Sequence, residues 1–114
     1  MFDIQQPDTY EWPVEVWIPR NGGRKVRATF TAEFKALEQT EIDSTVKDLR
    51  EGNPDADFGI QCLVGWKGMQ DGGVDLPYSD EAKARVMNKP YARNATVTAF
   101  FESITGKGAP RKNS

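Results

Sequence analysis

Two aspartates that flank a pair of glycines, in Asp71-Gly72-Gly73-Val74-Asp75, are the clearest candidates for metal chemistry in this sequence. A calcium-binding EF-hand loop requires oxygen ligands at its first, third and fifth positions and a glycine at its sixth. Here Gly73 holds the third position and Leu76 the sixth. The spacing therefore favours a flexible turn over a metal site.

Nucleophilic and phosphate-binding chemistry find little support in the residue types present. The sequence has no histidine, and its one cysteine, Cys62, has the helical spacing to Phe58 and Trp66 that predicts a buried, unreactive thiol. The residues after Gly68 lack the spacing and the lysine of a P-loop. Acids such as Asp55 lie near an expected helix start, where they interact with the helix dipole. The sequence therefore predicts no enzyme, no cofactor and no metal.

Charge and hydropathy exclude further classes of protein. The chain of 114 residues carries 17 acidic and 15 basic residues, a net charge of −2, which excludes a strongly basic nucleic-acid binder. Arg20, Arg24, Lys25 and Arg27 cluster near an expected hairpin tip and could contact nucleic acid, although a solvated strand edge is favoured. No run approaches the roughly 20 apolar residues that span a bilayer, and the first residues do not resemble a secretory signal.

An antiparallel β-hairpin is the clearest local prediction. Period-two alternation places apolar residues on one face of each strand, on both sides of the turn-forming Asn21-Gly22. The apolar positions are Val14, Val16 and Ile18 before the turn, and Val26, Ala28, Phe30, Ala32 and Phe34 after it. An isolated hairpin is marginally stable, so this face needs a covering layer, and we expect Phe30 to be buried.

Helical periodicity follows the hairpin. The first predicted helix starts at a variant of the capping box, in which Thr40 lies three positions before Asp43, and it ends at Gly52-Asn53. The second starts at Pro54 and carries Phe58, Cys62, Leu63 and Trp66 on one face. A third is capped by Ser79 and reaches Met87, and a fourth runs from Pro90 to a stop at Gly106. The predicted fold class is α+β: an N-terminal antiparallel β-hairpin followed by a bundle of about four helices.

The predicted organisation is one domain with two flanking segments. Residues 1–12 are expected as a flexible arm, with packing of Phe2 or Trp12 onto the core as the alternative. Residues 13–106 form the single α+β domain. Residues 107–114 are expected as a disordered basic tail, because they contain Lys107, Arg111 and Lys112 and no large apolar residue.

Adjacent phenylalanines in the last predicted helix suggest a partner surface. Phe100 and Phe101 point about 100° apart on a helix, so both cannot face one core. One of them, together with Val97, is a candidate for partner binding. The alternative is a helix that is covered on two sides.

Three ordered patches resemble the tail assembly chaperones of long-tailed bacteriophages and prophages, over residues 13–113. The patches are Val14-Glu15-Val16-Trp17-Ile18-Pro19 with Ala28-Thr29-Phe30-Thr31-Ala32-Glu33-Phe34, then Leu63-Val64-Gly65-Trp66-Lys67-Gly68 with Leu76-Pro77-Tyr78-Ser79-Asp80-Glu81-Ala82, and last Ala99-Phe100-Phe101-Glu102 with Lys112-Asn113. The passage from Trp66 to Ser79 matches best. We expect structure-defining roles for Phe30, Trp66, Gly68, Leu76, Pro77, Tyr78 and Ser79.

The resemblance implies a non-enzymatic assembly factor in the cytoplasm of a bacterial host. Such proteins bind the tape measure protein, keep it soluble and promote assembly of the tail tube. It also implies self-association and a frameshift-extended form that recruits the tail tube protein, with Gly106-Lys107 and Lys112-Asn113 as possible branch points. Two other hypotheses remain open: a structural tail-completion or connector protein of the virion, and a small nucleic-acid-binding regulator.

Overall fold

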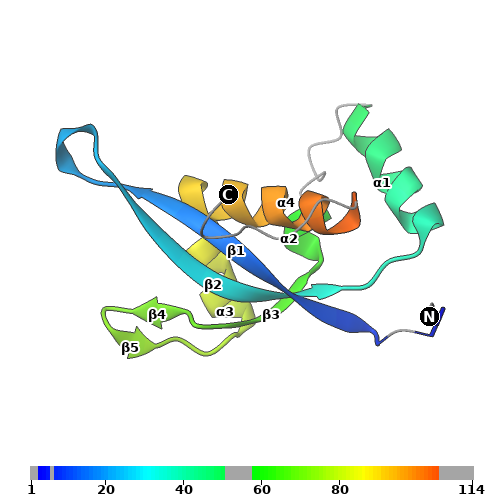
Figure 1. The fold of residues 1–114 in the computed structure, drawn as a ribbon, viewed down its shortest axis with the longest axis horizontal. Helices are drawn as coiled ribbons and strands as arrows, with labels where there is room; N and C mark the ends of the chain where they lie inside the picture. The colour runs from blue at the N-terminus through cyan, green and yellow to red at the C-terminus, as the bar shows by residue number, and fades with distance from the viewer. Residues whose placement is uncertain (1–2, 6, 51–57, 106–114) are drawn as a thin grey trace.

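The computed structural model describes residues 3–5, 7–50 and 58–105, without the side chains of residues 45–50, 58 and 59 (Figure 1). Two long strands come first, and short strands and helices follow them. In chain order the elements are β1 (Thr9–Pro19), the 3-10 turn η1 (Asn21–Gly23), β2 (Lys25–Lys35), α1 (Gln39–Arg50), α2 (Phe58–Gln61), β3 (Leu63–Lys67), β4 (Gln70–Asp71), β5 (Val74–Asp75), α3 (Asp80–Met87) and α4 (Pro90–Ile104).

The predicted hairpin is confirmed. Strands β1 and β2 pair antiparallel along their whole length, from Thr9 opposite Lys35 to Pro19 opposite Lys25. Gly22 and Gly23 have φ angles of 78° and 77°, a left-handed conformation that glycine adopts without a steric penalty. The chain therefore reverses over Asn21–Gly23, a segment that contains the predicted Asn21-Gly22.

The prediction of a bundle of about four helices was wrong. Within the described residues there are three helices of eight residues or more, α1, α3 and α4, while α2 is a single turn of four residues. The residues expected to continue the second helix form strand β3 instead, which pairs antiparallel with β2 from Lys67 opposite Thr31 to Leu63 opposite Phe34. The class remains α+β, with a three-stranded sheet in the order β1-β2-β3.

Hydrogen bonding explains why the second helix stops early. An apolar run as short as residues 60–66 fits a buried helix or a strand equally well. Strand β2 offers backbone N–H and C=O groups on the side away from β1, and buried groups of this kind need partners. Gly65 suits the strand, because it lets the Glu33 side chain lie directly over its backbone.

One face of the sheet carries the core. Helix α4 packs against β1, α2 and α3. The rings of Phe34 and Phe100 meet edge to face with centroids 5.2 Å apart, and both side chains are fully buried. Val14, Phe30 and Leu63 are buried in the same cluster. The predicted burial of Phe30 is thus confirmed, at 6% exposure.

The opposite face of the sheet is polar and holds cross-strand pairs. Glu15 contacts Arg27 at 3.2 Å, and Glu11 contacts Lys67 at 2.6 Å. Trp17 lies on this face and is 50% exposed. The alternation therefore separates an apolar face from a solvated one, as predicted.

The predicted segment boundaries differ in part from the observed elements. Strand β1 begins at Thr9, so residues 9–12 of the expected arm belong to the sheet, and Trp12 packs against the core. Helix α1 begins at Gln39, where the Glu38 N–H donates to Glu41 Oε1 at 3.3 Å in place of the expected Thr40–Asp43 cap. Four predicted features lie outside the described residues: the helix ends at Gly52-Asn53 and at Gly106, the helix start at Pro54, and the tail 107–114.

Candidate functional site

The passage from Trp66 to Ser79 folds as a short excursion from the sheet. Trp66 Nε1 donates a hydrogen bond to the Leu76 carbonyl oxygen at 2.8 Å, and its ring meets Tyr78 edge to face at 5.0 Å. The Tyr78 hydroxyl in turn donates to the Leu63 carbonyl oxygen at 3.2 Å. These contacts return the chain to β3 after the β4–β5 hairpin. Pro77, between the two anchoring residues, is exposed.

Gly68 is the point at which the chain leaves the sheet. It follows β3 directly and has a φ of +76°, in the left-handed region. A Cβ atom at this position would lie 3.9 Å from the Phe30 Cα, so the backbone also passes close to β2 here. The turn at Gly68 directs residues 69–75 away from β2 (Figure 1).

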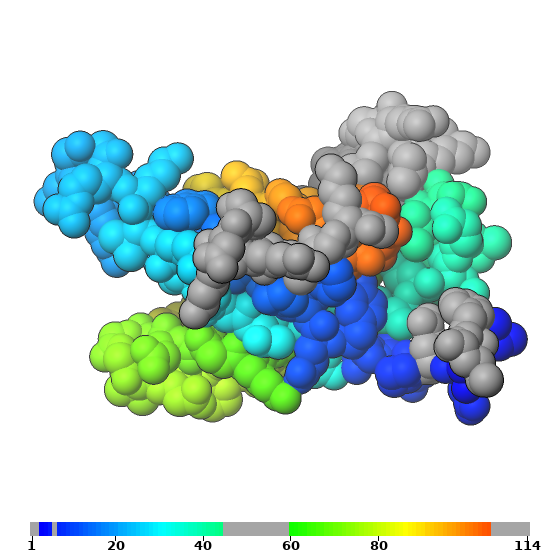
Figure 2. Space-filling view, viewed as in Figure 1, coloured from blue at the N-terminus to red at the C-terminus, as the bar shows by residue number. Residues whose placement is uncertain are grey.

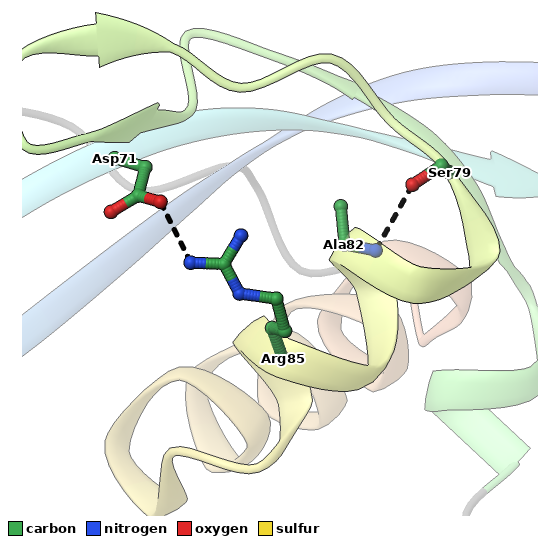
Figure 3. Close-up of polar contacts among 4 residues, drawn as sticks. All are labelled: Asp71, Ser79, Ala82 and Arg85. Atoms are coloured by element: carbon green, nitrogen blue, oxygen red, sulfur yellow. Dashed lines mark hydrogen bonds and ion pairs between the residues drawn. The ribbon is translucent and has the colours of Figure 1, made fainter.

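Two polar contacts fix helix α3 beneath this excursion (Figure 3). Ser79 Oγ accepts a hydrogen bond from the Ala82 N–H at 3.0 Å, which confirms the predicted N-cap. Arg85 Nη2 contacts Asp71 Oδ2 at 2.7 Å and so ties α3 to β4. Because Asp71 is engaged by an arginine, it serves as an anchor for the helix.

The candidate metal loop is a tight β-hairpin. Asp71 pairs with Val74 and Gln70 with Asp75, and Gly72 and Gly73 form the turn with positive φ. Across residues 3–5, 7–50 and 58–105, no group of three or more metal-binding side chains gathers.

The three residues proposed for partner binding lie on two sides of α4, with Val97 and Phe101 together and Phe100 apart from them. Phe100 is fully buried against Phe34, so a partner cannot reach it while α4 stays on the sheet. Val97 and Phe101 are half-buried and line a shallow hollow of about 370 Å³ together with Glu102. Of the two phenylalanines, Phe101 is therefore the one that borders an open hollow.

A larger apolar groove lies at the other end of α4. It has a volume of about 390 Å³ and runs between the outer half of the β1–β2 hairpin, the start of β4 and the helices α3 and α4. Its main apolar contributors are Val16, Ile18, Phe30, Met69, Val86 and Tyr91. The hairpin tip projects beyond the start of α4 (Figure 1). We call it the tip groove.

The tip groove has basic surroundings. Lys89 lines it, and Arg20, Arg24 and Lys25 are exposed at the adjoining end of the hairpin. Val26, the cross-strand partner of Ile18, is 39% exposed beside them. The tip groove therefore combines an apolar floor with positive charge, although the whole chain is slightly acidic.

A second hollow lies on the polar face of the sheet. It measures about 510 Å³ and includes Pro13, Arg27, Thr31 and Lys67. Thr29, Phe30 and Gly68 line both this hollow and the tip groove. The tip groove and this hollow thus lie on opposite faces of the sheet and meet where β3 ends.

Burial shifts the pKa values of two titratable groups near the core. Burial raises the pKa of the Cys62 thiol from 9.0 to about 11, so the thiol is protonated and unreactive at neutral pH. Burial also lowers the pKa of Lys83, whose Nζ donates to the Leu63 carbonyl oxygen at 2.8 Å. For both side chains, burial in the fold is the main cause of the shift in pKa.

The sequence did not indicate the tip groove. Ile18, Met69 and Tyr91 come from three distant parts of the chain and meet only in the fold. For strand β3, in contrast, the sequence held a local signal. Val64 and Trp66 favour strands and Gly65 disfavours helix, which together indicate a strand at this position.

Comparisons with protein-family models, curated proteins and solved structures found no match to this chain. No helix among the described residues is long and apolar enough to cross a membrane.

Proposed function

We propose that this chain is a non-enzymatic assembly chaperone of a phage tail. In this role it binds the tape measure protein, keeps it soluble and promotes assembly of the tail tube in the cytoplasm of the bacterial host. The resemblance in sequence motivates the proposal, and the tip groove is the structural feature that supports it most directly. An apolar groove with open access suits a surface that is buried only while a partner is bound.

The composition of the tip groove supports reversible binding. Ile18 and Tyr91 are half-buried, and Val26 is 39% exposed, so a partner gains apolar burial without disturbing the core. Lys89, Arg24 and Lys25 attract acidic residues that neighbour an apolar segment. Weak binding by each copy, repeated along one long partner, gives high avidity and still permits displacement.

A frameshift-extended form that recruits the tail tube protein, and self-association of the chain, are part of this proposal. The branch points Gly106-Lys107 and Lys112-Asn113 lie outside the described residues. The hollow beside Val97 and Phe101 offers a second, separate contact surface for these interactions.

Co-expression tests the proposed function directly. The tape measure protein that this proposal predicts to be encoded downstream is expressed with and without this chain, and the soluble fraction and any complex on gel filtration are measured. We expect the chain to raise solubility several-fold. If solubility does not change and no complex survives, the proposal is wrong. Recovery of the chain in purified particles would then favour a structural tail-completion or connector protein.

Two matched variants locate the binding surface. Val26 and Val64 are both strand valines with 39% exposure, but Val64 lies on β3 and outside the tip groove. Val26→Asp places a negative charge beside the groove and is expected to reduce co-solubility. Val64→Asp makes the same chemical change elsewhere and should leave it unchanged. Equal effects of both variants would argue against the tip groove as the contact.

A further inference from the structure

We propose that the strand β2 edge from Lys25 to Thr29 accepts an extended segment of a partner protein as an added β-strand. The segment has alternating apolar and acidic residues. Its apolar side chains enter the tip groove, and its acidic side chains lie over the hollow on the polar face. This inference rests on the proposed function only for the identity of the partner.

Backbone hydrogen bonds show which groups of β2 face away from β1. Outside the strands, the Arg20 N–H donates to the Arg24 carbonyl oxygen at 2.7 Å, and the Ala36 N–H donates to the Asp8 carbonyl oxygen at 2.8 Å. Both pairs continue the β1–β2 register. Hydrogen-bonded pairs alternate along an antiparallel ladder, so the even-numbered residues of β2 bond to β1 and the odd-numbered residues face the other side.

Strand β3 uses only part of this second side. The Lys35 N–H donates to the Cys62 carbonyl oxygen at 2.8 Å, and β3 continues the pairing as far as Lys67 opposite Thr31. At Gly68 the chain turns away. The outward N–H and C=O groups of Lys25, Arg27 and Thr29 therefore have no strand partner among the described residues, and all three residues are exposed.

The edge of β1 is protected in a way that this edge of β2 is not. The odd-numbered residues of β1 face outward, and they include Pro13 and Pro19, which have no N–H. Proline on an edge strand discourages pairing with another chain. Residues 25–29 of β2 contain no proline, so every outward N–H can donate.

The surroundings of this edge match an added strand. Side chains of a strand alternate between the two faces of a sheet. A strand that continued the line of β3 would point one set into the tip groove, beside Ala28 and Phe30, and the other set into the hollow beside Arg27. Thr29 lines both hollows. In Figure 2 the hairpin tip and the β4–β5 hairpin form two separate lobes at this end of the molecule.

The basic side chains around this edge indicate which kind of strand it accepts. Lys25 and Arg27 lie on the polar face of the edge, where Arg27 also contacts Glu15 of β1 at 3.2 Å. Arg24 lies next to them, and Lys89 lines the tip groove. Acidic side chains on the added strand complement them. A second copy of this chain pairing antiparallel through residues 25–29 would place Arg27 of one copy opposite Arg27 of the other, with both Lys25 side chains on the same face, and like charges in that arrangement are destabilising.

A synthetic peptide tests the mode of binding without the tape measure protein. The probe is a blocked, fluorescent peptide of about eight residues, an ordinary strand length, in which valine alternates with glutamate. Fluorescence anisotropy measures its affinity for the full chain. We expect it to bind at least about tenfold more tightly than a valine–lysine peptide or a peptide with the same residues in two blocks.

Proline and alanine at one position separate backbone from side-chain effects. Thr29→Pro removes the outward N–H and leaves the bonds to β1, and we expect roughly fivefold to tenfold weaker binding. Thr29→Ala keeps the N–H and should bind as the wild type does. Circular dichroism checks that both variants fold. Equal affinity of the two folded variants would overturn strand addition.

Amide hydrogen exchange on the wild-type chain gives an independent readout. The peptide should slow exchange at Lys25, Arg27 and Thr29, and leave the already bonded even-numbered amides nearly unchanged. Absence of binding by the alternating peptide, or binding without this protection, overturns the inference. If the tape measure protein is nevertheless kept soluble, the assembly function stands and only the strand mode is wrong. Protection at the edge without co-solubility would support the strand site and overturn the assembly function.

Discussion

The hydroxyl of Tyr10 donates a hydrogen bond to Ser103 Oγ over 2.6 Å and so joins the start of β1 to the last turn of α4. The direction follows from the second bond of Ser103, whose hydroxyl donates to the Phe100 carbonyl oxygen at 2.6 Å. The Tyr10 ring also packs against Phe34, with centroids 6.1 Å apart. These contacts tie a segment that the sequence left as a flexible arm to the centre of the core.

Removal of the Tyr10 hydroxyl should weaken this link. Tyr10→Phe keeps the ring contact with Phe34 and removes the bond to Ser103, so we expect a loss of about 1 kcal/mol in the free energy of unfolding. Urea denaturation measures it. Ser103→Ala should cost a similar amount, and the double variant should lose less than the sum of the two. Fully additive losses would show that the two hydroxyls do not interact in solution.

Phe30 should be among the most costly residues to truncate. It is 6% exposed and pairs across the hairpin with the fully buried Val14. Phe30→Ala removes a large buried ring and leaves a cavity, so we expect a loss of about 3–5 kcal/mol. Thermal melting followed by circular dichroism measures the effect. Val74→Ala, at a residue that is 69% exposed, serves as the control and should change stability little. A melting temperature unchanged by Phe30→Ala would contradict the assigned core.

The indole N–H of Trp66 should hold the β4–β5 excursion in place. Trp66→Phe keeps an aromatic ring beside Tyr78 and leaves the Leu76 carbonyl oxygen without its donor. We expect a loss of about 1–3 kcal/mol, with faster amide exchange concentrated in residues 69–76. Trp66→Ala also loses the ring packing and should cost more. Uniform exchange changes across the whole chain would show that the bond has no local role.

Alkaline pH should destabilise the fold through Cys62. Burial raises the pKa of its thiol from 9.0 to about 11, so the unfolded chain releases this proton at lower pH than the folded chain does. The thiol therefore contributes stability that is fully present below pH 9 and is lost as pH rises through about 11. Unfolding free energy measured by urea at several pH values should fall across this range, by an amount on the order of 1–2 kcal/mol.

Cys62→Ala is the control for the alkaline effect. It should reduce the slope between pH 9 and pH 11, whatever its effect at neutral pH. Tyr10 and Tyr78, whose pKa values are also raised by burial, retain a slope of the same sign in the variant. Lys83, whose pKa is lowered by burial, acts in the opposite direction. An identical slope in wild type and variant would show that Cys62 is not the responsible group.

Local sequence patterns predicted the parts of the fold that local physics controls. The alternation that runs from Val14 to Phe34 determines the face of each strand, and Asn21-Gly22 determines where the chain reverses. Ser79 caps α3 through a bond to Ala82, three residues away, and Pro90 starts α4 at a position where its missing N–H costs nothing. Each of these features involves neighbours in the chain or in one hairpin.

Tertiary structure decided the features that depend on distant partners. Residues 63–67 are a strand because β2 offers hydrogen bonds to them, and no local preference outweighs that pairing. Which phenylalanine faces the core was likewise settled by packing, since Phe100 meets Phe34 from a different element. The tip groove and the β2 edge from Lys25 to Thr29, which has no strand partner among the described residues, exist because Gly68 turns the chain away from the sheet directly after Lys67 pairs with Thr31. Sequence periodicity reports which face of a segment is apolar, whereas the end of one strand relative to another is set by contacts between segments that lie far apart in the chain.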